Sequence, residues 1–230
     1  MFENFDFNVI ERSWEYLFFT GMTFTLQLTL YAMVGGIVLG TLLAIARLSS
    51  FKLLSSVAGA YVNLIRALPL ILVIFWFYFL VPYIGQWMTG ASQPMKVGAF
   101  ASCLITFIMF EACYYCEIMR AGIQSISRGQ VSAGYALGLN YWQLMAHVVL
   151  PQAFRNMLPL LLTQTIILFQ DVSLVYVLSM PDFLGAASKV ARRDSRLVEM
   201  YLFVAVVYFI MAYTLSSGVK YLQARTAVIR

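Results

Sequence analysis

Two charged residues, Arg66 and Glu111, lie inside long apolar stretches of the 230-residue chain. An unpaired charge in such surroundings costs about 2.5 kcal/mol or more if the stretch crosses a membrane. Each residue lies about nine positions from the predicted inner end of its stretch, and a rise of about 1.5 Å per residue then gives the two side chains similar depths. They could form an ion pair across a helical bundle, or each charge could meet a different partner.

A later apolar stretch carries a second group of polar side chains at helical spacing. Thr163 and Gln170 are seven residues apart and share one helix face, while Gln164 and Asp171 form the neighbouring stripe. Amides and hydroxyls can hydrogen-bond a carboxylate or an ammonium without the strong trapping that a full opposite charge gives at low dielectric. This chemistry favours the passage of a polar solute over its storage.

Catalysis is the main alternative for the charged residues. Glu111, Glu117 and His147 could act as acid, base or ligands in a membrane-embedded enzyme, but His147 is not part of an H-E-x-x-H pattern. Cys113 and Cys116 lie in an apolar run, where thiols usually pack as small hydrophobes. We expect neither a catalytic residue nor a metal site. The sequence also lacks a G-x-x-x-x-G-K-S/T phosphate loop, so another subunit must hydrolyse ATP if ATP drives this protein.

The composition requires most of the chain to lie in lipid. Hydrophobic residues make up 62% of the sequence and charged residues 11%, far from the balance of a soluble domain. The length leaves room for about five spans of about 20 residues each, and for no separate soluble domain. We predict an all-α integral membrane protein with one domain over residues 1–230 and spans at about 23–46, 57–80, 97–119, 157–178 and 199–220.

Small residues and a proline predict how two of these spans are shaped. Gly36, Gly40 and Ala44 recur every four residues and give the first span one small face, against which another helix can pack closely. Pro69 is expected to kink the second span. The N-terminal segment 1–16 has acidic and aromatic residues and no basic leader, so we expect it at the outer interface and not as a signal peptide.

A polar stretch between the third and fourth spans predicts two short helices joined by an elbow. Ser127 followed by Gln130 predicts a capped helix start, and Gly138 supplies the left-handed residue that closes this helix. Asn140 followed by Gln143 predicts a second cap. The stretch is therefore expected to fold into a compact structure outside the membrane.

The second helix of the elbow is predicted to break near Leu150, because Pro151 disfavours helical geometry in the residue before it. The whole loop covers about 120–155. It resembles the cytoplasmic E-A-A loop of ABC importer permeases, specifically the polar amino acid group. Four elements carry the resemblance: Gly129–Gln130, Ala133–Gly134, Gly138 and Leu150–Ala153.

In this family the loop is the coupling helix that docks in a groove of the ATPase. The resemblance assigns that role here to Ser132, Ala133, Gly134 and Gly138. The chain departs from the family pattern at Ser132, where the family has glutamate, and at Gly134, where it has a second alanine. Because Ser132 cannot form the ion pair of that glutamate, docking is expected to depend on shape.

The resemblance extends from about Gly21 to the end of the fifth span. Its further segments are Gly21–Leu26, Ala46–Ser49, Arg66–Leu70, Glu117–Ile123 and Phe169–Leu174. In the last of these Gln170 stands where the family has lysine. The resemblance implies the fold of an ABC type I importer permease, in which we expect the substrate path to include Arg66, Glu111, Thr163, Gln164, Gln170 and Asp171.

The family also implies a function and a set of partners. The chain would be a permease subunit that imports an amino acid, and its likeness within the family is greatest to permeases for glutamate and aspartate. It would form a pore with a second, similar permease and work with two ATPase subunits, which bind the ATP, and a periplasmic binding protein. We expect it in the lipid of the bacterial inner membrane, without enzyme activity, a cofactor of its own or a nucleic-acid partner. A stand-alone secondary transporter is the second alternative, but such proteins usually show inverted repeats and this sequence shows none.

Five spans put the two termini on opposite sides of the membrane, and the resemblance implies that the N-terminus lies outside and the C-terminus in the cytoplasm. Most basic residues then lie inside, as the positive-inside rule expects: Arg47, Lys52, Arg120, Arg128, Arg155, Lys220, Arg225 and Arg230. The exception is the last external loop, 179–197, with Lys189, Arg192, Arg193 and Arg196. Its positive potential would favour an anionic amino acid or an acidic face of the binding protein, unless these residues are only a solvated charge run.

Overall fold

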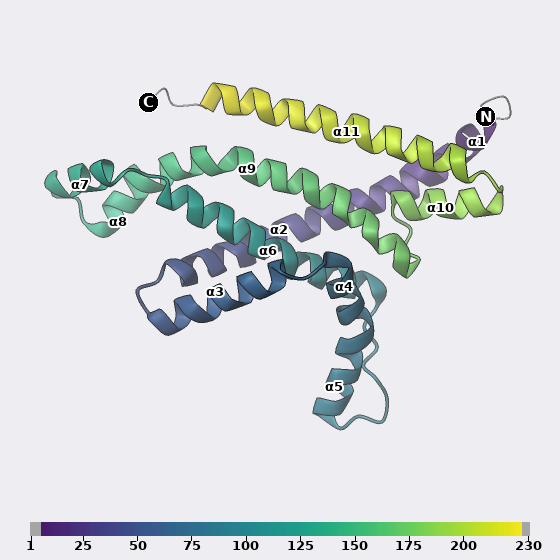
Figure 1. The fold of residues 1–230 in the computed structure, drawn as a ribbon, viewed down its shortest axis with the longest axis horizontal. Helices are drawn as coiled ribbons and strands as arrows, with labels where there is room; N and C mark the ends of the chain where they lie inside the picture. The colour runs from purple at the N-terminus through teal and green to yellow at the C-terminus, as the bar shows by residue number, and fades with distance from the viewer. Residues whose placement is uncertain (1–5, 227–230) are drawn as a thin grey trace.

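Long helices make up the body of the protein (Figure 1). The computed structural model describes residues 6–226, which contain no strand; Arg230 lies outside these residues. The α-helices are α1 (Asn8–Glu15), α2 (Thr23–Leu48), α3 (Lys52–Arg66), α4 (Leu70–Phe75), α5 (Val81–Thr89), α6 (Ala99–Gln124), α7 (Arg128–Ala136), α8 (Tyr141–Leu144), α9 (Leu150–Asp171), α10 (Phe183–Arg193) and α11 (Leu197–Thr226). The π-helical segments are η1 (Tyr16–Met22), η2 (Trp76–Leu80) and η3 (Met145–Val149), and a 3-10 helix forms η4 (Val172–Leu178).

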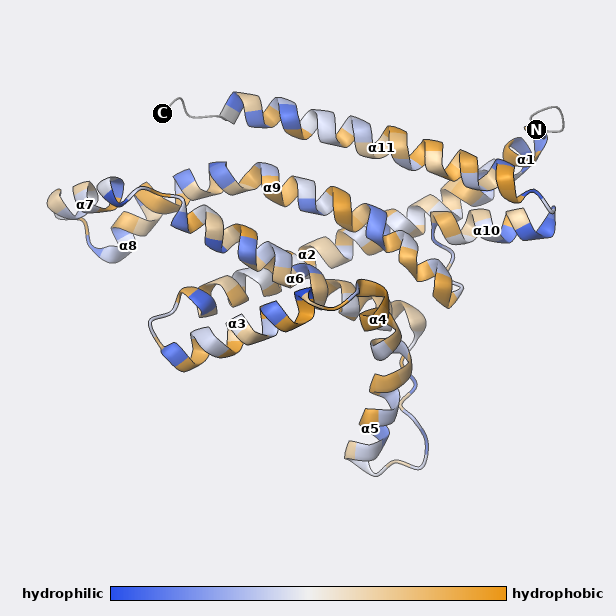
Figure 2. Ribbon diagram, viewed as in Figure 1, coloured by the Kyte–Doolittle hydropathy of each residue, from blue (hydrophilic) through white to orange (hydrophobic). Residues whose placement is uncertain are grey.

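Five helical segments are long and apolar enough to cross a membrane, as the sequence predicted. They are Asn8–Leu48, Leu70–Thr89, Ala99–Gln124, Tyr141–Leu178 and Leu197–Arg225. Their outward faces carry exposed apolar side chains, among them Leu42 and Phe209, which suit contact with lipid. Hydrophilic residues lie at the last turn of α10, near the ends of α6 and α9 that lead to α7 and α8, and on α3 (Figure 2). The described residues therefore form an all-helical membrane domain.

The predicted second span, at about 57–80, is wrong as a single helix. α3 ends at Arg66, residues 67–69 are not helical, and α4 begins at Leu70. Pro69 has no N–H to donate and disfavours helical geometry in the residue before it, so the expected kink is a complete break. α3 packs against α2 and α6, α4 packs against α6, and α5 extends away from the long helices (Figure 1).

Two helices run further than the sequence indicated. The first continues from Asn8 to Leu48, because η1 joins α1 to α2. The predicted break near Leu150 is also wrong, since η3 leads from α8 directly into α9. Pro151 removes one N–H and its ring crowds the preceding turn, but the wider π-helical turn just before it relieves this conflict without ending the helix. Most of the predicted loop at about 120–155 is consequently helical.

The predicted small-residue face of the first span is confirmed, and it packs against α6. A Cβ atom at Gly40 would lie 2.9 Å from the carbonyl oxygen of Ala112, and one at Gly36 would lie 3.1 Å from the Cβ of Glu111. Ala44, one turn further, is 2% exposed. The backbones of α2 and α6 therefore approach more closely than larger side chains would allow. This contact turns Glu111 into the interior.

The predicted external loop at 179–197 contains a well-defined helix, α10. The carboxylate of Asp182 caps it, accepting from the N–H groups of Leu184 at 3.0 Å and Gly185 at 3.2 Å. The helix packs against α11, η1 and η4, at the end of the molecule where the N-terminus lies (Figure 1). Lys189, Arg192 and Arg193 are thus held on a helix, whereas Arg196 lies between α10 and α11.

Candidate functional site

A turn that glycine adopts readily closes α7. Gly138 has a φ of 81°, which confirms the predicted left-handed position. Its N–H donates to the carbonyl of Tyr135 at 2.9 Å, and the N–H of Leu139 donates to the carbonyl of Gly134 at 3.2 Å. These two bonds form a Schellman motif, which satisfies carbonyl groups that the end of a helix leaves without partners. The direction of the chain between α7 and α8 depends on this turn.

α8 begins with the predicted capping box. The N–H of Gln143 donates to the Asn140 side chain at 3.0 Å, and the Gln143 side chain accepts from the N–H of Asn140 at 3.0 Å. The equivalent prediction for Ser127 is wrong, because its side chain makes no cap bond. Its backbone carbonyl accepts from the N–H of Gln130 at 3.1 Å instead. The elbow is therefore fixed by side chains at α8 and by backbone bonds at α7.

The four predicted coupling residues lie together on this elbow. Ser132 and Ala133 are exposed on α7, and Gly138 is exposed in the turn. Gly134 is buried, and a Cβ atom there would overlap the side chain of Leu144. Gly134 therefore allows α7 to lie against α8, while Ser132 and Ala133 remain available to a partner. Their contact with an ATPase stays a prediction.

Two large apolar residues of the elbow were missed by the sequence reasoning. Leu137 is 82% exposed and Trp142 is 78% exposed. Both flank the turn at Gly138, one at the end of α7 and the other in α8. The sequence did contain a signal for them, because a large apolar residue in an otherwise polar stretch usually packs against the protein or binds a partner. They give the elbow an exposed apolar surface that suits a groove in another protein.

An ionic cluster joins the C-terminal ends of α2 and α6. The carboxylate of Glu117 accepts from Arg120 at 2.8 Å, as the sequence predicted, and it also contacts the guanidinium of Arg47 at the end of α2. Arg120 donates further to Gln124 at 2.7 Å. The role of Arg47 was not predicted, because it depends on how two distant helices pack.

A hydrogen bond links α6 to the start of α9 beside this cluster. The Asn156 amide donates to the Ser125 hydroxyl at 2.8 Å, and Ser125 itself donates to the carbonyl of Gly122 at 2.8 Å. The two helices that enter and leave the elbow are therefore tied together.

Of the two alternatives left open for Arg66 and Glu111, the structure shows separate partners and no direct ion pair. The Arg66 guanidinium lies over the ring of Tyr114, 5.1 Å from its centroid. Glu111 is fully buried, and its carboxylate accepts from the Gln164 amide at 3.0 Å. The break after α3 leaves Arg66 on an exposed helix end, whereas the close packing at Gly36 turns Glu111 inward.

The structure separates the six residues predicted for a substrate path. Glu111 and Gln164 form the buried bond between α6 and α9. Thr163 and Gln170 are exposed on another face of α9, and Asp171 is half-buried at its end. Arg66 lies on α3, apart from this group. An exposed polar face on a helix within a membrane domain requires a polar neighbour or water, so Thr163 and Gln170 are the best placed of the six to meet a solute or a second subunit.

The residues of the enzyme alternative have separate partners. Glu111 binds Gln164, and Glu117 binds Arg120. The exposed His147 uses its Nδ1 to bond the carbonyl of Gln143 at 3.0 Å. No acid–base pair of the described residues joins these three side chains.

Relatives of known function agree with this architecture. The chain is 52% identical over 223 residues to the glutamate/aspartate import permease protein GltK of Escherichia coli O6:H1, a match that covers 97% of this chain and 99% of that protein. It is 33% identical over 209 residues to the probable glutamine ABC transporter permease protein GlnM of Bacillus subtilis, covering 91% and 93% of the two chains.

Solved structures share the fold. A crystal structure of an amino acid ABC transporter with histidines superposes with a TM-score of 0.85 at 30% identity, covering 96% of this chain and 98% of the other. An inward-facing structure of the MetNI methionine ABC transporter has a TM-score of 0.67 at 18% identity, with coverage of 96% and 98%, and supports the fold alone. The fold is that of an ABC type I importer permease.

The family described as binding-protein-dependent transport system inner membrane component matches residues 36–228. That range contains α6, the elbow, α9 and the polar groups described above. The stand-alone secondary transporter receives no support from these matches. The chain belongs to the family of binding-protein-dependent transport system inner membrane components, the permease subunits of ABC importers.

Proposed function

We propose that this protein is the permease subunit of an ATP-driven importer of acidic amino acids, with glutamate and aspartate as substrates. The observation that carries the proposal is the 52% identity to a glutamate/aspartate import permease over nearly the whole of both chains. The exposed amide and hydroxyl of Gln170 and Thr163 suit this substrate class, because they can hydrogen-bond carboxylate and ammonium groups without trapping them.

ATP is bound and hydrolysed by separate subunits in this proposal, and the permease itself carries no cofactor. The complex contains a second, similar permease, two ATPase subunits and a periplasmic binding protein. The elbow docks in the ATPase groove through Ser132, Ala133 and the apolar residues Leu137 and Trp142. Because the Ser125–Asn156 bond ties α6 to α9, movement of the elbow moves both helices.

In this proposal the protein lies in the inner membrane of a bacterium. Its N-terminus is outside and its C-terminus is in the cytoplasm. In support, the elbow and the C-terminal end of α11 lie at one end of the molecule, and α1 and α10 lie at the other (Figure 1). Arg47, Arg120 and Arg128 cluster at the elbow end, which the positive-inside rule places in the cytoplasm.

The composition of the complex can be tested directly. The tagged permease is solubilised in detergent and purified, and the subunits that accompany it are identified. Uptake of labelled glutamate is then measured in proteoliposomes containing the whole complex and its binding protein, with and without ATP inside. We expect a second permease and an ATPase to co-purify, and uptake to require ATP. Uptake by the permease alone would contradict the proposal.

A further inference from the structure

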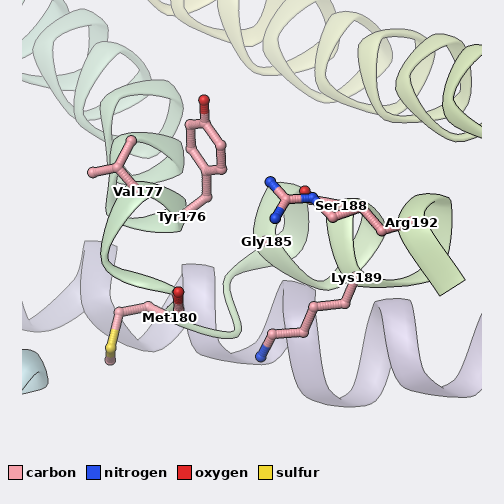
Figure 3. A pocket seen from close by; sticks show the side chains of 8 residues that line it. Tyr176, Val177, Met180, Gly185, Ser188, Lys189 and Arg192 are labelled. Carbon is pink, nitrogen blue, oxygen red and sulfur yellow. The ribbon is translucent and has the colours of Figure 1, made fainter.

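A cavity of about 350 Å³ lies at the outer end of the protein, between η4 and α10. It is lined by Tyr176, Val177, Ser179, Met180, Gly185, Ser188, Lys189 and Arg192. Figure 3 shows the guanidinium of Arg192 from α10 beside Tyr176 from η4, and Lys189 of the same helix extending in the other direction. Its volume is near the lower end of the range for small-molecule sites, which suits a ligand of amino-acid size.

The basic residues of this segment divide into two pairs. Arg193 donates to the carboxylate of Asp194 at 2.9 Å, a hydrogen bond that holds the pKa of Asp194 below its usual range, and Arg196 bonds Glu199 at 3.0 Å. Lys189 has no carboxylate within 4.0 Å among residues 6–226, and neither has Arg192.

The cavity therefore holds two positive charges and no lining carboxylate. Asp182 lies close enough for its charge to interact with that of Lys189. It is buried, however, and both of its carboxylate oxygens accept hydrogen bonds from backbone N–H groups at the start of α10. Lys189 and Arg192 are three positions apart and so lie on one helix face, about 5–6 Å apart at their Cβ atoms. The hydroxyl groups of Tyr176 and Ser179 add neutral donors and acceptors. An anion with carboxylate groups complements this lining.

We propose that this cavity binds a carboxylate of the acidic amino acid at the outer face of the permease, before the substrate meets the polar face of α9. This inference rests on the proposed function. Continuity of the chain supports it, since η4 follows directly on α9 and places Tyr176 six residues beyond Gln170. Lys189 and Arg192 supply the charge that attracts the substrate, and Gln170 supplies the weaker neutral contact that follows.

The test uses the complete complex in proteoliposomes with its binding protein and labelled glutamate. Lys189→Gln and Arg192→Gln are compared singly and together with the matched variant Arg193→Gln, which removes an equal charge that is already paired. We expect the double variant to lower the uptake rate at subsaturating concentrations of the loaded binding protein about tenfold, the lower limit for electrostatic attraction of a ligand, and Arg193→Gln to leave it within about twofold. Thermal unfolding of each purified complex shows whether it is intact.

A second measurement tests whether Lys189 and Arg192 bind the substrate or the binding protein. The affinity of the substrate-free binding protein for the complex should be unchanged in the double variant. A loss of that affinity would show that the two residues dock the binding protein, and would overturn the proposal. Normal uptake at subsaturating concentrations of the loaded binding protein in an intact double variant would also overturn it. If the unaltered complex does not import glutamate or aspartate, the proposed function fails, whatever the variants do.

Discussion

The Gln164 amide of α9 donates to the fully buried Glu111 carboxylate of α6 at 3.0 Å. This bond satisfies one oxygen of a group that has no access to water in the described structure. It also sets the rotation of α9, because Gln164 turned inward places Thr163 and Gln170 on the exposed face.

The first prediction concerns this bond. Gln164→Met keeps the size of the side chain but leaves the Glu111 carboxylate without its donor, and should lower the unfolding free energy of the solubilised protein by about 1–3 kcal/mol. Thr163→Val is the neighbouring control, since the Thr163 hydroxyl bonds only the carbonyl of Pro159 in its own helix. A double-mutant cycle with Glu111→Met should give a coupling energy of about 1 kcal/mol or more. Additive effects would rule out a direct interaction.

The second prediction concerns the contact between α2 and α6. Gly40→Ala should lower the unfolding free energy by about 1–3 kcal/mol, because the new Cβ atom would press on the backbone of α6. Gly218→Ala is the matched control, since a Cβ atom there would have no neighbour within 4 Å. Chemical unfolding of the solubilised variants measures both changes. Equal stability of Gly40→Ala and Gly218→Ala would contradict the packing described here.

The third prediction concerns the elbow. Gly138→Val should uncouple ATP hydrolysis from uptake, because a branched residue at a φ of 81° costs of the order of 1–2 kcal/mol and displaces α8. Gly138→Asn should retain most of the coupling, since asparagine adopts the left-handed region more readily. The measured quantity is the ratio of amino acid imported to ATP hydrolysed in proteoliposomes. An unchanged ratio in Gly138→Val would show that the turn does not transmit movement.

The fourth prediction concerns pH. Burial raises the pKa of Asp182, which lies outside the membrane-spanning segments, to about 7. Its pKa in the unfolded chain is about 3.9, so between these values the folded protein binds more protons and becomes less stable as the pH rises. Asp182→Asn should retain the cap of α10 and lose this part of the slope. Thermal unfolding at intervals from pH 4 to 8 measures it, and parallel curves for the two proteins would contradict the shifted pKa.

The sequence predicted features that depend on neighbouring residues in the chain. Apolar length predicted the number of spans, the spacing of Asn140 and Gln143 predicted a capping box, and Gly138 predicted the left-handed turn. Each of these is decided within a few residues, where backbone geometry and local hydrogen bonds determine the outcome.

The features that failed depend on how the helices rotate and approach one another. Equal depth suggested that Arg66 pairs with Glu111, but depth says nothing of the direction in which a side chain points. That direction is fixed by the contact at Gly36 and by the break before Leu70. The contact of Arg47 with Glu117 likewise required the packed helices. The cavity beside α10 could not be predicted from the sequence either, because it is formed by the packing of α10 against η4.

Competition for uptake tests the central claim most directly. Proteoliposomes with the complete complex and its binding protein take up labelled glutamate in the presence of excess unlabelled glutamate, aspartate, glutamine, arginine or histidine. We predict that glutamate and aspartate suppress the uptake of label almost completely and that the other three have little effect. If glutamine, arginine or histidine competes best, the protein remains an ABC importer permease but its assignment to acidic amino acids is contradicted.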